Sequence, residues 1–162
     1  MRNSKLENSV NYLVGDNKIF NKSTIPYDNI ICDFLSEFSK ELMKNKNANK
    51  FPDIKTLAFW CREKNIINLK KKFETNKTRV GLGLVFHITP SNIPTNFAYS
   101  LIFGLITGNS NIVKVPSKKF DQISIICDAI KKILKKEKFN LIKKMITIVR
   151  YNSNDDYTKK IS

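Results

Sequence analysis

The sequence predicts an α/β protein in which N-terminal helices precede a partial Rossmann-like unit with three parallel strands. First, no Lys, Arg, Asp or Glu occurs between Arg79 and Lys114, although the 162-residue chain carries 29 basic and 14 acidic residues. Second, four of the five Gly and three of the five Pro divide residues 81–117 into strand, turn, helix, turn and strand. Third, an amphipathic helix and another apolar strand follow. This alternation is typical of parallel sheets with helical crossovers.

The first half of the chain is expected to contain two helices. Residues 1–27 are polar and irregular, with only short apolar spots. From Asp28, a residue type that favours the N-cap position, apolar side chains recur at helical spacing up to a Lys- and Asn-rich loop at residues 44–50. These side chains are Ile30, Ile31, Phe34, Leu35, Phe38 and Leu42. A second helix is predicted to begin at Pro52, because proline suits the first helical position, and to end near lysines 70–72.

The uncharged segment is expected to contain a buried strand, a loop, a helix and another strand. Residues 79–89 form an apolar run of the kind that parallel sheets bury on both faces. Two prolines exclude regular structure from residues 89–94, which are therefore predicted to be a loop. Thr95 is predicted to cap a buried helix that continues to about residue 107, and residues 111–115 form the next strand.

The remaining residues complete a βαβαβ pattern. Gly108-Asn109 is a helix-ending turn signal, and residues 120–136 have the apolar stripe of an amphipathic helix. A short turn at residues 139–141 leads to a third strand at residues 145–151, and Asp155 begins another expected helix. Three parallel strands make half of a doubly wound domain, with right-handed connections. The chain is therefore expected to be the front of a longer protein.

Composition restricts the classes of partner. The formal net charge of +15 is compatible with nucleic acid, an anionic membrane surface or an acidic ligand. The alternative is a bias of composition, because nearly all the basic residues are Lys in a chain rich in Asn and Ile. No nucleic-acid-binding motif and no interleaving of basic and aromatic residues is present, so nucleic acid is not expected as a partner.

The cysteines and the hydropathy indicate the compartment. Cys32, Cys61 and Cys127 are widely spaced and accompany a single His, a pattern that predicts neither a metal site nor a disulfide framework. Each is expected to be a small buried apolar residue. No N-terminal apolar run of a signal peptide and no run of about 20 apolar residues occurs. We therefore expect a soluble cytoplasmic protein without a membrane span.

Asn92 is the main candidate for chemistry. It lies in the turn Pro90-Ser91-Asn92-Ile93-Pro94, just after a predicted parallel strand, where α/β proteins bind ligands. Its amide could donate to a developing oxyanion, or it could hydrogen-bond its own backbone as turn asparagines do. His87 is the only His, and it is either a general base near the strand end or a packing residue of the strand.

These residues carry a resemblance. The turn around Asn92 is similar to the P-W-N-F-P turn of the aldehyde dehydrogenase superfamily, and Gly108-Asn109 with Val113-Lys114 is similar to its G-N-x-V-V-x-K strand. The segment GLVFHITPSNIPTNFAYSLIFGLITGNSNIVKVPSK resembles more closely the bacterial acyl-CoA reductases of the LuxC type, which supply fatty aldehyde to luciferase in luminous bacteria and have relatives in non-luminous ones. The resemblance runs from about residue 50 to the end, including residues 58–62 and 148–151, and it is weaker before the central segment.

The resemblance implies an NADPH-dependent reduction of a long-chain fatty acyl thioester, either acyl-CoA or acyl-protein, to the aldehyde. The acyl group would first be transferred to a cysteine thiolate. Asn92 would stabilise the oxyanion, and Lys114 would contact the adenosine ribose or its 2′-phosphate. Thr89 and Pro90 would shape the nicotinamide wall, and Ser117 would lie near the adenine. Acyl-protein synthetase and acyl transferase subunits are the partners implied, and the full-length family is expected to be oligomeric.

The sequence departs from this family pattern in three ways. Ser91 replaces the Trp of the superfamily turn, and an inserted residue places Lys118 loosely at the position of a ribose-binding Glu. The nucleophilic Cys of the family lies in a later catalytic domain, and none of the three Cys matches it. We therefore expect residues 1–50 to be a polar segment and helix, residues 51–162 to be an incomplete cofactor-binding domain of the aldehyde dehydrogenase type, and the catalytic domain to be absent. The fragment alone is then inactive; the alternative is a stand-alone nucleotide- or partner-binding module.

Overall fold

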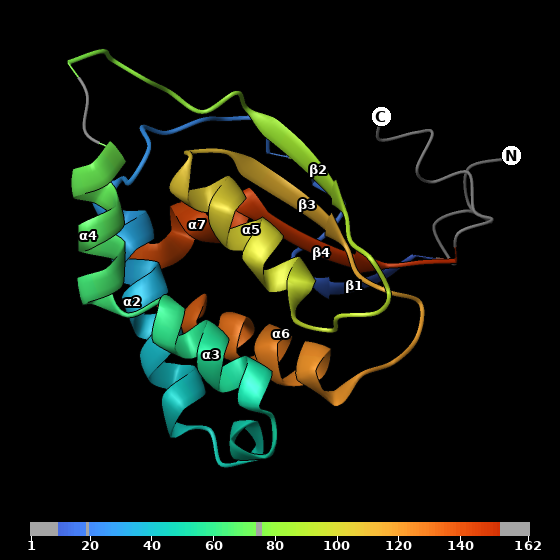
Figure 1. Ribbon diagram of the computed structural model, residues 1–162. Coiled ribbons are helices and arrows are strands. Elements are labelled where there is room, and N and C mark those ends of the chain that lie inside the picture. Colours follow the sequence, from blue (N-terminus) through green and yellow to red (C-terminus); the bar gives the residue numbers. More distant parts are fainter. Residues whose placement is uncertain (1–9, 19, 74–75, 153–162) are drawn as a thin grey trace, which may run out of the picture.

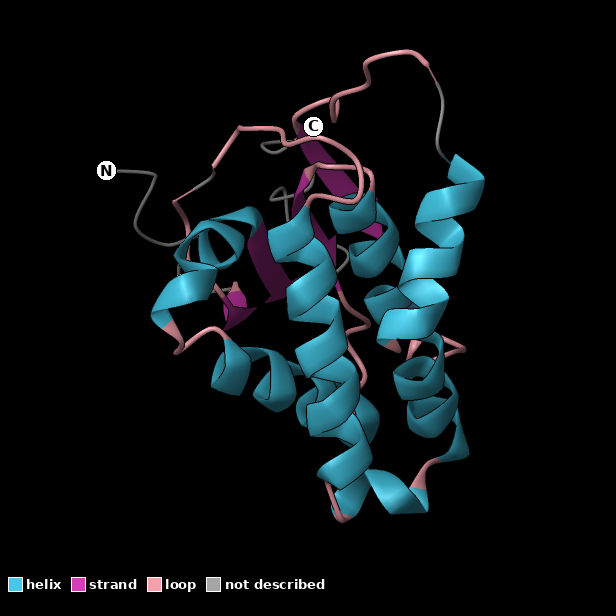
Figure 2. Cartoon of the chain, turned by 90° about the vertical axis from the view of Figure 1, so that its left-hand side faces the viewer, coloured by secondary structure: helices cyan, strands magenta, loops and turns pink. Residues whose placement is uncertain are grey.

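The computed structural model describes residues 10–18, 20–73 and 76–152. This part of the chain has an α/β architecture, with helices packed against a four-stranded mixed sheet (Figure 1). Figure 2 shows the strands gathered in one group behind the helices. The expected helix beginning at Asp155 lies outside the described residues.

The sheet has the strand order β1-β4-β3-β2. Strands β2 (Leu84–Ile88), β3 (Ser110–Lys114) and β4 (Ile146–Arg150) pair in parallel, which confirms the predicted parallel unit. Strand β1 (Asn11–Val14) pairs antiparallel with β4 and makes the sheet mixed. The prediction that residues 1–27 are irregular is therefore wrong at β1. The assignment of the parallel part to a Rossmann-like domain of the aldehyde dehydrogenase type stays a prediction.

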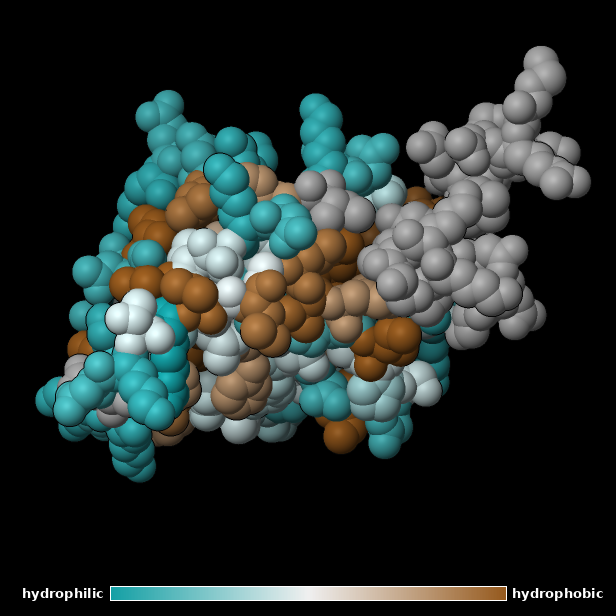
Figure 3. Space-filling model, turned by 90° about the horizontal axis from the view of Figure 1, so that it is seen from above, coloured by the Kyte–Doolittle hydropathy of each residue, from teal (hydrophilic) through white to brown (hydrophobic). Residues whose placement is uncertain are grey.

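Strand β2 differs from the buried strand that the apolar run predicted. It begins only at Leu84, and it lies at the edge of the sheet, where its residues are partly exposed. Large apolar side chains just before and at the end of β2 are exposed, namely Val80, Leu82 and Ile88. Seen from above, the molecule shows apolar surface in the middle of this face (Figure 3). β2 belongs to the sheet, and β3 pairs with one of its two sides. Among the described residues, no strand pairs with its other side.

Helix α2 (Asn29–Lys44) begins where the sequence predicted. The Asp28 carboxylate accepts a hydrogen bond from the Ile30 backbone N–H at 3.0 Å, which confirms the N-cap. The predicted loop after α2 contains a short 3-10 helix, η1 (Asn47–Lys50).

The helix predicted to begin at Pro52 is in fact two helices, α3 (Pro52–Trp60) and α4 (Glu63–Phe73). The Arg62 carbonyl oxygen accepts the first backbone hydrogen bonds of α4. The Asn65 side-chain amide donates to the Phe59 carbonyl oxygen at 2.8 Å and so fixes the corner between the two helices. The single-helix prediction was wrong because no Gly or Pro marks this break.

The helices of the second half are α5 (Asn96–Ile106), α6 (Asp121–Ile133) and α7 (Asn140–Met145), with the 3-10 helix η2 (Glu137–Phe139) before α7. The first two confirm the predicted crossover helices. Thr95 precedes α5, but its side chain makes no capping hydrogen bond, so the predicted cap is wrong in this detail. The turn predicted at residues 139–141 is helical.

The main core lies between the sheet and the helices. It includes Val113 of β3 and Ile148 of β4 together with apolar side chains of α2 to α7. Their neighbours Ile112 and Val149 belong to a smaller cluster on the opposite face of the sheet, with Tyr151. This alternation follows from the two-residue period of a strand and separates the side chains of β3 and β4 into two sets.

The segment before α2 is attached to the loops that flank β2 and β3. The Thr24 N–H donates to the Gly108 carbonyl oxygen at 2.8 Å, and the Gly81 N–H donates to the Thr24 carbonyl oxygen at 3.0 Å. The Ser110 hydroxyl donates to the Lys22 carbonyl oxygen at 2.8 Å. Gly108 has a φ of +85°, which confirms the predicted helix-ending turn. The turn after α5 is therefore held by a segment that lies far away in sequence.

Candidate active site

The candidate site lies where the parallel strands β2 and β3 end. Because the two strands are parallel, the loops that follow them leave the sheet at the same edge (Figure 1). Residues 89–95 connect β2 to α5, and residues 115–120 connect β3 to α6. The residues singled out from the sequence, Thr89, Pro90, Asn92, Lys114 and Ser117, all lie at the end of β3 or in these two loops.

Thr89 and Lys114 are brought together by backbone and side chain. The Thr89 hydroxyl donates to the Lys114 carbonyl oxygen at 2.8 Å, and the Thr89 N–H donates to the same oxygen at 3.3 Å. Pro90 follows Thr89 and is exposed. The start of the loop after β2 is thus fixed to the last residue of β3.

Lys114 is a buried cation. It is 8% exposed, and its ammonium nitrogen lies 4.5 Å from the centroid of the Tyr151 ring. Within residues 10–18, 20–73 and 76–152, no carboxylate forms an ion pair with it. Buried charges are normally paired, since desolvation of an isolated charge is costly. Among the described residues, the Lys114 ammonium contacts the aromatic face of Tyr151, and it therefore retains N–H donors for an anionic ligand.

The loop after β3 is tied to the end of β4. The Ser117 hydroxyl donates to the Tyr151 carbonyl oxygen at 3.2 Å, and the Arg150 Nε–H donates to the Pro116 carbonyl oxygen at 3.1 Å. Ser117 itself is exposed. Tyr151 therefore contacts both Lys114, through its ring, and Ser117, through its backbone.

Asn92 lies in an exposed bend between the two prolines. In the part of the chain that the structure describes, no hydrogen bond of its side chain is present, and none joins it to Thr89 or Lys114. Its amide is therefore accessible to a ligand. Its role as an oxyanion donor stays a prediction.

His87 packs beneath α5. Its Nε2 lies 2.9 Å from Asn111 Oδ1, and the Asn111 amide nitrogen donates to the Asn109 carbonyl oxygen at 2.7 Å. Because Asn111 Oδ1 is then the acceptor, His87 donates from Nε2. His87 pairs with Val113 in the register, so its side chain lies on the face of the sheet opposite to Lys114. This geometry favours the packing role over that of a general base.

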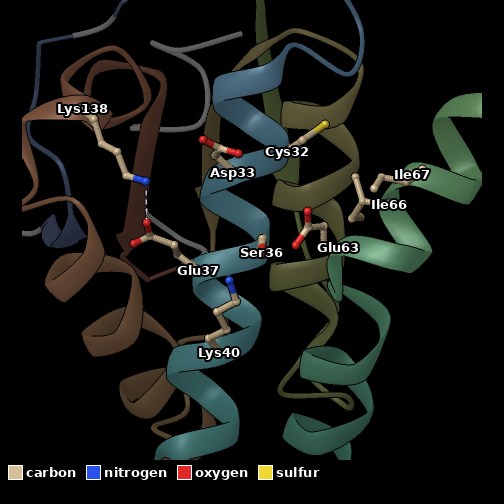
Figure 4. A pocket seen from close by; sticks show the side chains of 9 residues that line it. All are labelled: Cys32, Asp33, Ser36, Glu37, Lys40, Glu63, Ile66, Ile67 and Lys138. Atoms are coloured by element: carbon tan, nitrogen blue, oxygen red, sulfur yellow. Dashed lines mark ion pairs between the residues drawn. The ribbon is translucent and has the colours of Figure 1, made fainter.

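The three cysteines are not poised for nucleophilic attack. Burial raises the pKa of Cys61 and of Cys127 to about 12. Burial is also the main cause that raises the pKa of Cys32, which lines a groove between α2 and α4 together with several charged side chains (Figure 4). In Figure 4 the Cys32 side chain points away from that of Asp33, whose charge raises the thiol pKa further. At neutral pH all three are thiols, whereas the attacking species would be a thiolate.

Thiol labelling tests this assignment. At pH 8 the folded protein should react with iodoacetamide slowly and mainly at Cys32, because Cys61 and Cys127 are buried and remain protonated up to a pH of about 12. In denaturant all three should react at the rate of a free thiol, as mass spectrometry of peptides would show. Rapid labelling of Cys61 or Cys127 in the folded protein would contradict the structure.

Metal-ligating side chains are not clustered in the described residues. Among them, no group of three or more His, Cys, Asp and Glu side chains could hold a metal ion. In the same residues, no helix has the length and apolar character needed to cross a membrane.

Two residues of this region were not selected from the sequence. Tyr151 was assigned only to the end of a strand, and Asn111 only to the start of one. The signal for Tyr151 is the register of parallel strands: Lys114 pairs with Val149, so the residue two positions later lies on the same face as Lys114. No local signal identifies Asn111, because its partners depend on how β2 and α5 meet β3.

Comparison with known proteins gives one match. The family model described as acyl-CoA reductase (LuxC) matches residues 33–161, which is most of the 162-residue chain. No curated protein and no solved structure matches the chain significantly. The matched range contains β2, β3, β4 and every residue of the candidate site.

Proposed function

Because the chain belongs to the acyl-CoA reductase (LuxC) family, we propose that it forms the cofactor-binding part of an NADPH-dependent reductase of long-chain fatty acyl thioesters. The product is the fatty aldehyde. The observation that carries this proposal is the buried ammonium of Lys114 at the carboxyl ends of parallel strands, which pairs with no carboxylate of the described residues. NADPH, when bound, supplies the hydride.

Lys114 is suited to hold the 2′-phosphate of the cofactor. A phosphate takes the place that no carboxylate of residues 10–18, 20–73 and 76–152 occupies, and the interaction is strong because the ammonium is shielded from water. The hydrogen bonds from Thr89 fix the backbone of Lys114, so its side chain starts from a rigid position. We place Thr89 and Pro90 at the nicotinamide side and Ser117 at the adenine side.

Asn92 is the proposed oxyanion donor. Its side chain is accessible, and it follows β2 within a turn bounded by two prolines. A fixed amide donor at the thioester oxygen contributes roughly 10²–10³ in rate. In this proposal Asn92 binds the thioester oxygen, whereas Lys114 binds the cofactor.

The attacking thiolate is proposed to come from outside this sequence. All three cysteines have raised pKa values and lie on helices or helix ends rather than in the candidate site. The chain alone is then a nucleotide-binding protein without turnover. Acyl-CoA and acyl-protein thioesters remain the substrate classes, with an acyl-protein synthetase and an acyl transferase as proposed partner subunits in the cytoplasm.

Titration of the purified chain with NADPH, followed by calorimetry, tests the proposal. Wild type should bind NADPH, and Lys114→Met should weaken binding about tenfold or more, because a charge-assisted hydrogen bond is lost. Lys119→Met is the matched control, since Lys119 is an exposed lysine of the same loop, and it should bind as wild type does. Absence of NADPH binding, or equal affinity in wild type and Lys114→Met, would overturn the cofactor assignment.

An activity assay separates the cysteine assignment from the cofactor assignment. With tetradecanoyl-CoA and NADPH, the chain alone should oxidise no NADPH. Oxidation that is abolished by Cys32→Ser, Cys61→Ser or Cys127→Ser would show that the nucleophile lies on this chain.

A further inference from the structure

The Tyr151 ring is the surface on which the Lys114 ammonium rests. The nitrogen lies 4.5 Å from the ring centroid, within the range of a cation–π interaction. Tyr151 is only 2% exposed, so its ring is held in place by its surroundings. The Lys114 side chain therefore has a defined position at the carboxyl end of β3 before any ligand binds.

The backbone around Tyr151 fixes the second proposed cofactor residue. The Ser117 hydroxyl donates to the Tyr151 carbonyl oxygen at 3.2 Å, and the neighbouring Arg150 donates to the Pro116 carbonyl oxygen at 3.1 Å. The end of β4 thus sets the position of the loop after β3 at Pro116 and at Ser117. Tyr151 therefore contacts both proposed cofactor residues: its ring contacts Lys114, and its carbonyl oxygen accepts the hydrogen bond from Ser117.

We propose that Tyr151 is a positioning residue that holds Lys114 toward the cofactor and thereby sets the preference for a 2′-phosphorylated nucleotide. This inference depends on the proposed function, in which Lys114 contacts the 2′-phosphate. The ring does not touch the reacting atoms. It keeps a flexible lysine side chain in one place, so that less conformational freedom is lost when the phosphate binds.

A double-mutant cycle tests the inference with NADPH and NADH as ligands. Tyr151→Leu should weaken NADPH binding about fivefold and leave NADH binding unchanged, because only NADPH carries the 2′-phosphate. Tyr151→Phe keeps the ring and should bind NADPH as wild type does. In the Lys114→Met background, Tyr151→Leu should have no further effect on NADPH affinity. An equal effect of Tyr151→Leu in both backgrounds would show a merely structural role and overturn the inference.

A second measurement needs no cofactor and separates this inference from the proposed function. Lys114 should be acylated by acetic anhydride slowly in wild type and in Tyr151→Phe, and several times faster in Tyr151→Leu, where the ring no longer holds it. Lys55 is the internal control, because its ammonium bonds the Met43 carbonyl oxygen at 3.0 Å, far from Tyr151 in sequence, and its rate should not change. Equal acylation of Lys114 in all three proteins overturns the positioning role. If Lys114→Met binds NADPH as wild type does, while Lys114 is still acylated faster in Tyr151→Leu than in wild type, only the cofactor assignment is overturned.

Discussion

Replacing Phe34 by alanine should lower the free energy of unfolding by about 3–5 kcal/mol. Phe34 is 1% exposed on α2, and its ring centroid lies 6.3 Å from that of Phe38 and 5.6 Å from that of Phe139. Removal of the ring leaves a cavity between α2 and the segment before α7, where the surrounding side chains are too well packed to close it. Urea denaturation followed by circular dichroism measures the loss.

Phe59→Ala is the matched control, because it removes the same atoms from a side chain that is 53% exposed. The Arg62 guanidinium lies over the Phe59 ring, 4.4 Å from the ring centroid. Beyond that contact, the Phe59 side chain contributes little to the free energy of unfolding. Its replacement should cost less than about 1 kcal/mol. Similar losses for Phe34→Ala and Phe59→Ala would contradict the position of Phe34 in the core.

Gly104→Ala should destabilise the protein by about 3 kcal/mol, although alanine normally favours a helix. A Cβ at this position of α5 would lie 1.8 Å from Asn111 Oδ1 and 3.0 Å from His87 Nε2. Asn111 cannot simply turn aside, because its amide bonds both His87 and the Asn109 backbone. The substitution must therefore displace α5 or break buried hydrogen bonds. Thermal unfolding and urea denaturation report the loss.

The sign of the effect should change when Asn111 is removed. In an Asn111→Ala background the nearest obstacle is absent and the His87 ring is no longer held by Asn111, so Gly104→Ala should then be neutral or stabilising by up to about 1 kcal/mol through helix propensity. An equal loss in both backgrounds would show that something other than the contact with Asn111 requires glycine. This contact lies where α5 packs against β3.

Helices and strands with strong local patterns could be predicted from the sequence. The apolar stripes of α2 and α6 and the capping Asp28 depend on neighbours within a few residues, so the sequence contains their cause. The parallel pairing of β2, β3 and β4 follows from connections that are too long for hairpins. These predictions used only spacing and turn chemistry.

The elements that were missed depend on distant partners. Strand β1 has four residues, and its pairing with β4 joins residues that are more than 130 positions apart. The break between α3 and α4 is fixed by one side chain, Asn65, without a Gly or Pro. The edge position of β2 depends on the order of strands, which hydropathy does not contain.

The candidate site was predictable as a location but not as a set of contacts. The turn after β2 could be selected because ligands bind beyond the carboxyl ends of parallel strands, whereas Lys114 at the end of β3 was selected through the family resemblance. The aromatic support beneath Lys114 required the register of β3 on β4. The raised pKa values of Cys61 and Cys127 could not be predicted from the sequence, because they depend on how deeply the packed helices bury these thiols.

The pairing of β1 with β4 has a consequence for the order of folding. During synthesis, β1 emerges first, but its partner strand is completed only at residue 150. The hydrogen bonds that Lys22 and Thr24 make likewise form only after Gly108 and Ser110 have been synthesised. Contacts of such high sequence separation slow folding, because a long loop must close before they form. The helices α2, α3 and α4 can therefore associate on the ribosome, whereas the sheet is completed only after β4 has left the exit tunnel.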